Sequence, residues 1–160
     1  MIDPTKLNYI LRGCVGIYYI IQERLTEGII MTNEEKVQHW VNMANYDIES
    51  ADVMMKSKRN LYVGFICHLT VEKMLKAYFV KITEETPPYI HNLRLLAEKT
   101  DIYSMMSEEQ KDFLNELNPL QIEARYQEYK SAIEKKLTDK ATQEILTKTK
   151  EMMAWIKSKI

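Results

Sequence analysis

The sequence has few of the residues that break regular structure or build common metal and redox sites. Only four glycines and four prolines occur in 160 residues, so the chain has few turns and favours long elements. The two cysteines, Cys14 and Cys67, stand far apart among apolar neighbours. This pattern indicates buried thiols in a reducing compartment, and nothing in it favours a disulfide between them. The chain contains no CxxC or HExxH motif and no glycine-rich phosphate loop, so we predict neither a metal nor a cofactor.

Excess charge and long apolar runs are also lacking. The formal net charge is −1, which gives no general attraction to nucleic acid, so such contact would need a local patch. The apolar run at residues 14–21 is too short to span a bilayer, and no small-residue cleavage site follows it. We therefore expect a cytoplasmic protein with no membrane contact.

The residues that are abundant favour helix. Methionine, lysine and glutamate are plentiful, and β-branched runs are scarce. Asp3 and Pro4 resemble a helix start, and apolar residues then recur at helical spacing, although residues 15–21 also fit a strand. We expect residues 1–31 to form an N-terminal helical extension, and Met31 is a candidate for the native start.

Residues 32–160 are expected to form one all-α domain. Thr32 and Glu35 form a capping box that opens a long amphipathic helix. Further helices are predicted over residues 61–82, 93–97, 107–117, 119–125 and 138–160. We predict an antiparallel up-and-down bundle of four to five helices, with the 61–82 helix at its centre because apolar positions surround its axis.

Three ionisable residues interrupt this otherwise apolar central helix. His68, Glu72 and Lys76 follow one another at four-residue steps, so they form a ladder along one side. One interpretation is a solvated stripe where the bundle opens to water. The other is a polar seam inside the bundle, retained because something binds there, with Asp47 or Arg125 as a partner from another helix.

The order of several short motifs resembles that of the HEPN family. The motifs are Trp40-x3-Ala44-x2-Asp47-x3-Ala51, Val71-Glu72-Lys73-x-Leu75-Lys76, His91-Asn92-Leu93-x2-Leu96 and Arg125-Tyr126. No single motif is specific for this family, but the order and separation of the motifs over residues 32–158 are specific for it. The resemblance implies a helical bundle that forms a homodimer and often acts with a small nucleotidyltransferase, as a two-component, toxin–antitoxin-like pair.

The resemblance also implies a polar site that binds a nucleotide or an RNA phosphate. The residues expected there are Arg125, Tyr126, His91, Glu72, Lys76, Asp47 and Lys73. For Arg125 two interpretations stay open: a salt bridge to Asp47 or Glu72, or a fork that holds a phosphate while Tyr126 stacks on a base. Lys73 lies on another side of its helix from Glu72 and fits a lysine that reaches past apolar surface to water.

The sequence departs from the pattern of the family's active ribonucleases. The resemblance implies that those enzymes use an arginine followed, after four to six residues, by a histidine. Arg125 is followed by YQEYKSAIEKK, and no other arginine has a histidine at that spacing. We therefore expect a non-catalytic binding module. The alternatives are a divergent metal-independent ribonuclease, in which His91 or His68 replaces the missing histidine, and a structural adaptor without a ligand.

Overall fold

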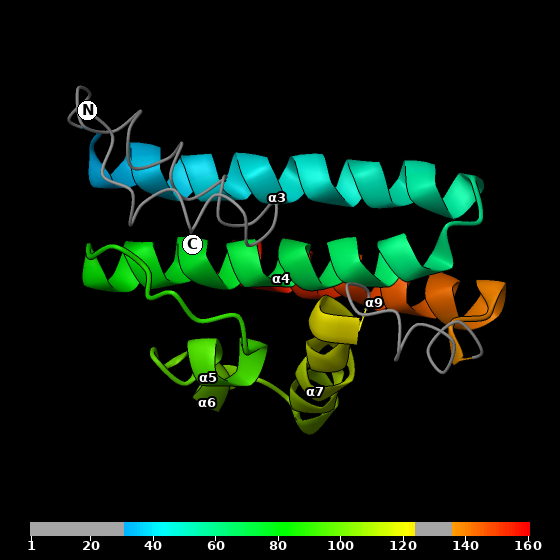
Figure 1. The fold of residues 1–160 in the computed structure, drawn as a ribbon. Helices are drawn as coiled ribbons and strands as arrows, with labels where there is room; N and C mark the ends of the chain where they lie inside the picture. Colours follow the sequence, from blue (N-terminus) through cyan, green and yellow to red (C-terminus); the bar gives the residue numbers. More distant parts are fainter. Residues whose placement is uncertain (1–30, 124–135) are drawn as a thin grey trace, which may run out of the picture. The chain divides into compact units, whose positions relative to one another are not determined.

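The described part of the chain consists of helices and the segments between them (Figure 1). The computed structural model describes residues 31–123 and 136–160. Its helices are α3 (Asn33–Lys56), α4 (Asn60–Thr83), α5 (Leu93–Ala97), α6 (Ile102–Met105), α7 (Glu108–Glu123) and α9 (Asp139–Lys157). The prediction of an all-α helical bundle is confirmed. The helix expected within residues 1–31 lies outside the described residues, so the division of the chain at that point stays a prediction.

Helix α4 is the centre of the compact unit Asn33–Ile160. It contacts α3, α5, α7 and α9, and its buried residues occur on all sides of its axis, as the surrounding apolar positions predict. A connection of three residues turns the chain between α3 and α4, which lie antiparallel (Figure 1). None of the helices that the structure describes is both long and apolar enough to cross a bilayer.

Helix α9 runs in the same direction as α4, because α5, α6 and α7 carry the chain back to the start of α4. Asn60 in the first turn of α4 donates from Nδ2 to the Leu137 carbonyl at 2.9 Å and to Asp139 Oδ1 at 2.8 Å. The first turns of α4 and α9 are thus joined side by side (Figure 1). This contact fixes the level at which α9 packs on the central helix.

Side chains cap the starts of α5, α7 and α9. Ser107 and Gln110 form a reciprocal capping box at α7, with contacts of 2.9 and 3.2 Å. Thr138 accepts a hydrogen bond from the Ala141 amide at the start of α9. Asn92 accepts one from the Leu95 amide at the start of α5, which fixes the helix directly after His91.

The predicted break at Asn118 and Pro119 is wrong. Helix α7 continues through Pro119 to Glu123. The proline removes one backbone donor and leaves the carbonyl of Asn115 without its helical partner. Both Pro119 and Asn115 are exposed, so water can solvate that carbonyl. The Asn118 side chain does not cap a new helix but accepts a hydrogen bond from the Leu93 amide at 2.8 Å.

We expect the substitution Thr138→Ala to lower the free energy of unfolding by about 1 kcal/mol, because it removes the side-chain cap of α9. Urea unfolding followed by circular dichroism measures this loss. Thr147→Ala is the matched control, since the exposed Thr147 hydroxyl only bonds back to the Gln143 carbonyl of its own helix. Equal effects of the two substitutions would contradict the assigned cap.

Candidate functional site

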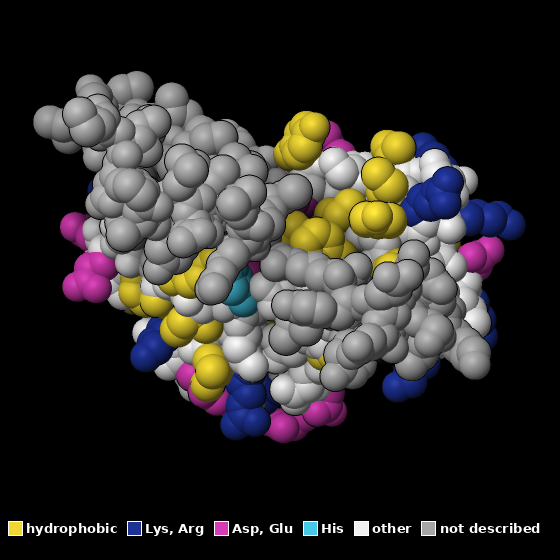
Figure 2. Space-filling view, viewed as in Figure 1, with side chains coloured by type: hydrophobic (Ala, Val, Ile, Leu, Met, Phe, Trp, Pro, Cys, Tyr) yellow, Lys and Arg dark blue, Asp and Glu magenta, His cyan; other side chains and the backbone are white. Residues whose placement is uncertain are grey.

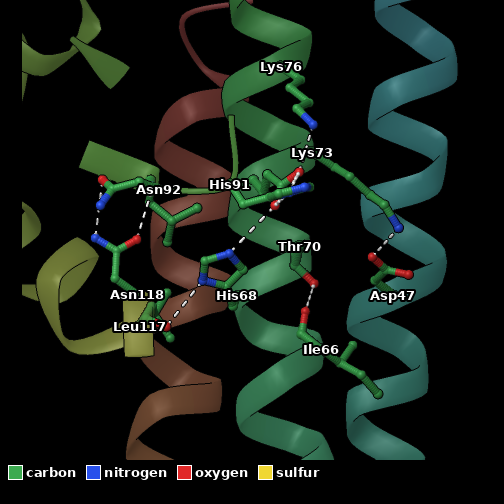
Figure 3. Close-up of polar contacts among 12 residues, drawn as sticks. Asp47, Ile66, His68, Thr70, Lys73, Lys76, His91, Asn92, Leu117 and Asn118 are labelled. Atoms are coloured by element: carbon green, nitrogen blue, oxygen red, sulfur yellow. Dashed lines mark hydrogen bonds and ion pairs between the residues drawn. The ribbon is translucent and has the colours of Figure 1, made fainter. Parts of the chain in front are cut away.

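The charged ladder of the central helix is buried. His68 and Lys76 are 0% exposed, and Glu72 is 4% exposed. Burying a charge is costly unless an opposite charge and hydrogen bonds compensate for it. The solvated-stripe interpretation is therefore wrong, and these side chains form a polar seam inside the bundle (Figure 3).

Glu72 is the centre of this seam. Lys76 donates from Nζ to Glu72 Oε1 at 2.6 Å. The Nδ1 atom of His91 lies 3.2 Å from Oε1 and 3.1 Å from Oε2 of the same carboxylate. Since an ionised carboxylate can only accept, we assign the proton of the His91 ring to Nδ1. The carboxylate thereby fixes the orientation of a histidine that comes from the segment between α4 and α5.

The groups around Glu72 connect it to two further helices. The Lys76 ammonium lies 5.3 Å from the ring centroid of Trp40 on α3, a cation–π distance. His68 Nε2 is 3.5 Å from Glu72 Oε2, and its Nδ1 lies 3.1 Å from the Leu117 carbonyl on α7. We refer to Glu72, Lys76, His68 and His91 as the Glu72 cluster.

The Glu72 cluster keeps its carboxylate ionised. Burial is the largest single influence on the pKa of Glu72 and would raise it. The contacts with His68 and His91 and the charge of Lys76 act in the opposite direction. Together they outweigh burial, so the pKa of Glu72 lies well below its ordinary value.

A second ion pair joins α4 to α3 beside the Glu72 cluster. Lys73 donates to Asp47, and the two side chains are 13% and 15% exposed (Figure 3). Burial raises the pKa of Asp47, although the charge of Lys73 acts against this rise. Burial and the Lys73 charge both lower the pKa of His39 on α3. Lys73 therefore bonds across the helix interface and does not simply extend to water as the sequence suggested.

The predicted site residues divide into an interior set and a rim. Glu72 and Lys76 lie inside the bundle, whereas the side chains of His91, Asp47 and Lys73 are 22%, 15% and 13% exposed. We call His91 and Lys73 the rim. Figure 2 shows one histidine side chain at the surface of this face, next to apolar side chains. The interior pair is thus buried, whereas the rim keeps partial contact with solvent.

Two amides hold the segment that carries His91. Asn118 Oδ1 on α7 accepts from the Leu93 amide at 2.8 Å, and Asn118 Nδ2 lies 3.5 Å from Asn92 Oδ1 (Figure 3). The ring of His91 is thus held by Glu72, and the next two residues, Asn92 and Leu93, are held by Asn118. Nothing in the sequence indicates this contact, because the spacing of Asn118 does not relate it to residues 92 and 93.

Arg125 and Tyr126 lie outside the described residues, so their place beside the rim stays a prediction. His68 and Trp40 were not among the predicted site residues, although the four-residue spacing from Glu72 indicated the position of His68. Across residues 31–123 and 136–160, no three His, Cys, Asp or Glu side chains are grouped so that they could hold a metal ion. The chemistry available at the rim is hydrogen bonding, charge and proton transfer by an imidazole.

The chain resembles known proteins in its sequence and in its fold. Residues 37–159 match the model of the HEPN domain. The crystal structure of TT1696 from Thermus thermophilus superposes with a TM-score of 0.67 at 15% identity, covering 78% of this chain and 98% of that one. At this identity the likeness shows the fold alone. No curated protein matches the chain.

We expect Glu72→Gln to lower the free energy of unfolding by about 3 kcal/mol, because it removes the carboxylate that compensates the buried Lys76 ammonium. The double variant Glu72→Gln/Lys76→Met should lose less than the sum of the two single losses, since it removes both charges. Chemical unfolding measures all three variants. The control is Glu98→Gln, which breaks the exposed pair with Arg94 and should have a far smaller effect. Additive losses at residues 72 and 76 would contradict the pairing.

The Glu72 cluster should also make stability depend on pH. Because the folded pKa of Glu72 is lowered, its contribution is fully present well above the ordinary value of 4.5 and is lost as the pH falls toward the folded pKa. We expect the free energy of unfolding of the wild type to fall more than that of Glu72→Gln between about pH 6 and about pH 3.5. Urea unfolding at a series of pH values measures the difference. Parallel curves for the two proteins would contradict the lowered pKa.

Proposed function

The chain belongs to the HEPN domain family, and on this premise we propose that it is a module that binds the phosphate of a nucleotide or of RNA. The observation that carries the proposal is His91, a partly exposed histidine whose Nδ1 is held by a buried, ionised carboxylate. With Nδ1 bound to Glu72, the other ring nitrogen is the atom that can meet a ligand. A protonated Nε2 donates to a phosphate oxygen.

The charges of the site favour an anion at the rim. Glu72 is matched by Lys76, and Asp47 is matched by Lys73, so the two carboxylates are compensated within the bundle. A protonated His91 then adds net positive charge at the surface. In this proposal Arg125 supplies a bidentate fork for the same phosphate, and Tyr126 lies against the base. Glu72, Lys76 and Asp47 hold the site in place.

The proposed module works with other chains. We propose a homodimer, which is the usual state of this family, and a nucleotidyltransferase partner in a two-component, toxin–antitoxin-like system of the cytoplasm. A nucleotidyltransferase in the neighbouring reading frame would support this pairing. Purified together, the two proteins should elute as one complex in size-exclusion chromatography, and two separate peaks would contradict the pairing.

Titration calorimetry with AMP and with a short single-stranded RNA tests phosphate binding. We expect His91→Gln and Arg125→Ala each to weaken binding by about tenfold to a hundredfold, the loss that follows when a charged hydrogen bond to a phosphate is removed. Binding should also weaken as salt is added. The control is Arg59→Ala, which removes an exposed arginine between α3 and α4.

Each outcome of this titration separates two candidates. Binding that is weakened by the substitutions at residues 91 and 125 but not at residue 59 supports the proposed module. If the wild type gives no heat with AMP, with RNA or with the transferase, the proposal fails and a ligand-free structural adaptor is left. Equal effects of all three substitutions would indicate nonspecific attraction only.

A second candidate is a divergent metal-independent ribonuclease, and the Glu72–His91 contact favours it. A carboxylate that fixes one imidazole nitrogen leaves the other oriented to take a proton from a ribose 2′-hydroxyl. Incubation of RNA without added metal tests this activity. Cleavage that is lost in both Arg125→Ala and His91→Ala would establish the enzyme, whereas the binding module predicts intact RNA with every variant.

A further inference from the structure

An exposed tyrosine lies directly beside the rim. Tyr89 belongs to the segment between α4 and α5 and is 65% exposed. Its ring centroid is 4.8 Å from that of His91, and the two rings meet edge to face at 76°. The aromatic ring therefore adjoins the histidine that the Glu72 cluster orients.

The segment around Tyr89 restricts how that ring can move. Pro87 and Pro88 precede it and fix two φ angles, and the Ile90 amide bonds to the Pro88 carbonyl at 2.8 Å. On the other side, the His91 ring is bonded to Glu72. A side chain with two rotatable bonds on such a backbone loses little entropy when it contacts a ligand.

The exposed ring has the properties of a stacking surface for a base. Tyr89 is 65% exposed, so it lacks the hydrophobic stabilisation that a tyrosine ring gains when it is buried in the core. An aromatic ring beside a phosphate-binding group is the arrangement by which proteins hold single nucleotides and single-stranded RNA, since every base has a face that can stack. A nucleotide carries its base one ribose away from its phosphate, so neighbouring side chains can contact both parts.

We propose that Tyr89 stacks on the base of the nucleotide or RNA residue whose phosphate His91 binds. The inference rests on the proposed phosphate-binding function and adds Tyr89 as a second aromatic contact to the base, beside the one that the proposed function gives to Tyr126. The ring contributes affinity for the base and none for a bare sugar phosphate. Stacking alone discriminates weakly among bases, so the subsite accepts purines and pyrimidines, with purines favoured by their larger face.

Two ligands separate this inference from the function on which it rests. AMP carries a base, and ribose 5-phosphate carries the same phosphate without one. We expect Tyr89→Ser to weaken AMP binding about tenfold and to leave ribose 5-phosphate binding unchanged, as measured by NMR titration. Tyr89→Phe should bind AMP like the wild type. Nuclear Overhauser contacts between the Tyr89 ring and the base protons should be seen in the wild-type complex.

The control is Tyr62→Ser, which removes a tyrosine of similar exposure, 57%, at the start of α4 and should leave both affinities unchanged. Unchanged AMP binding in Tyr89→Ser would overturn the inference, with the phosphate site intact. Equal weakening of both ligands would also overturn it, because Tyr89 would then act by positioning His91. If the wild type binds neither ligand, the proposed function fails and the base subsite fails with it. Equal melting temperatures confirm that each variant is folded.

Discussion

Glu72 is ionised inside the bundle, and the polar groups around it are arranged to hold that charge. An isolated carboxylate in such a position would be neutralised or expelled. Here the Lys76 ammonium at 2.6 Å and the His91 ring at 3.1 Å supply what water would otherwise provide, and His68 Nε2 lies 3.5 Å away. The positions of Lys76, His68 and His91 therefore depend on one another. These contacts also bring together α3, α4, α7 and the segment before α5.

Removing the charges of the Glu72 cluster from water costs free energy, and this cost is relevant to its function. Replacing a buried ion pair by apolar residues of similar volume is often neutral or stabilising, so stability alone does not explain the cluster. What it does provide is a surface imidazole with a fixed ring and a fixed proton. In the binding module that we propose, a ligand would meet His91 as a group already in place, which reduces the entropy lost on binding. The same anchor holds the segment that displays Tyr89.

Much of the fold could be predicted from the sequence, because its signals are local. Apolar spacing predicted α3 and α4, and the helices predicted to begin at residues 107 and 138 agree with the starts of α7 and α9. The helix break predicted at Pro119 was wrong because a proline breaks a helix in most settings but is tolerated here on an exposed side. The short helix α6 was not predicted, since four residues carry too little periodicity to detect.

The candidate site was predictable only where its members share a helix or a known motif. The four-residue spacing placed His68, Glu72 and Lys76 in one row, but spacing could not show whether that row faces water or the interior. The contact between Glu72 and His91 joins residues 19 positions apart, and only the family resemblance grouped them. The role proposed for Tyr89 could not be predicted from the sequence, because it depends on the contact of its ring with that of His91.

We propose that buried Glu72 orients His91 to receive a phosphate, and nitrogen NMR of the imidazole rings can examine this orientation atom by atom. Long-range proton–nitrogen spectra report which ring nitrogen carries the proton and which one changes when a ligand is added. We predict a protonated Nδ1 in His91 of the free protein and a shift of its Nε2 resonance on addition of AMP, with His68 unchanged. A His91 ring protonated only at Nε2, or resonances that AMP does not move, would contradict the account.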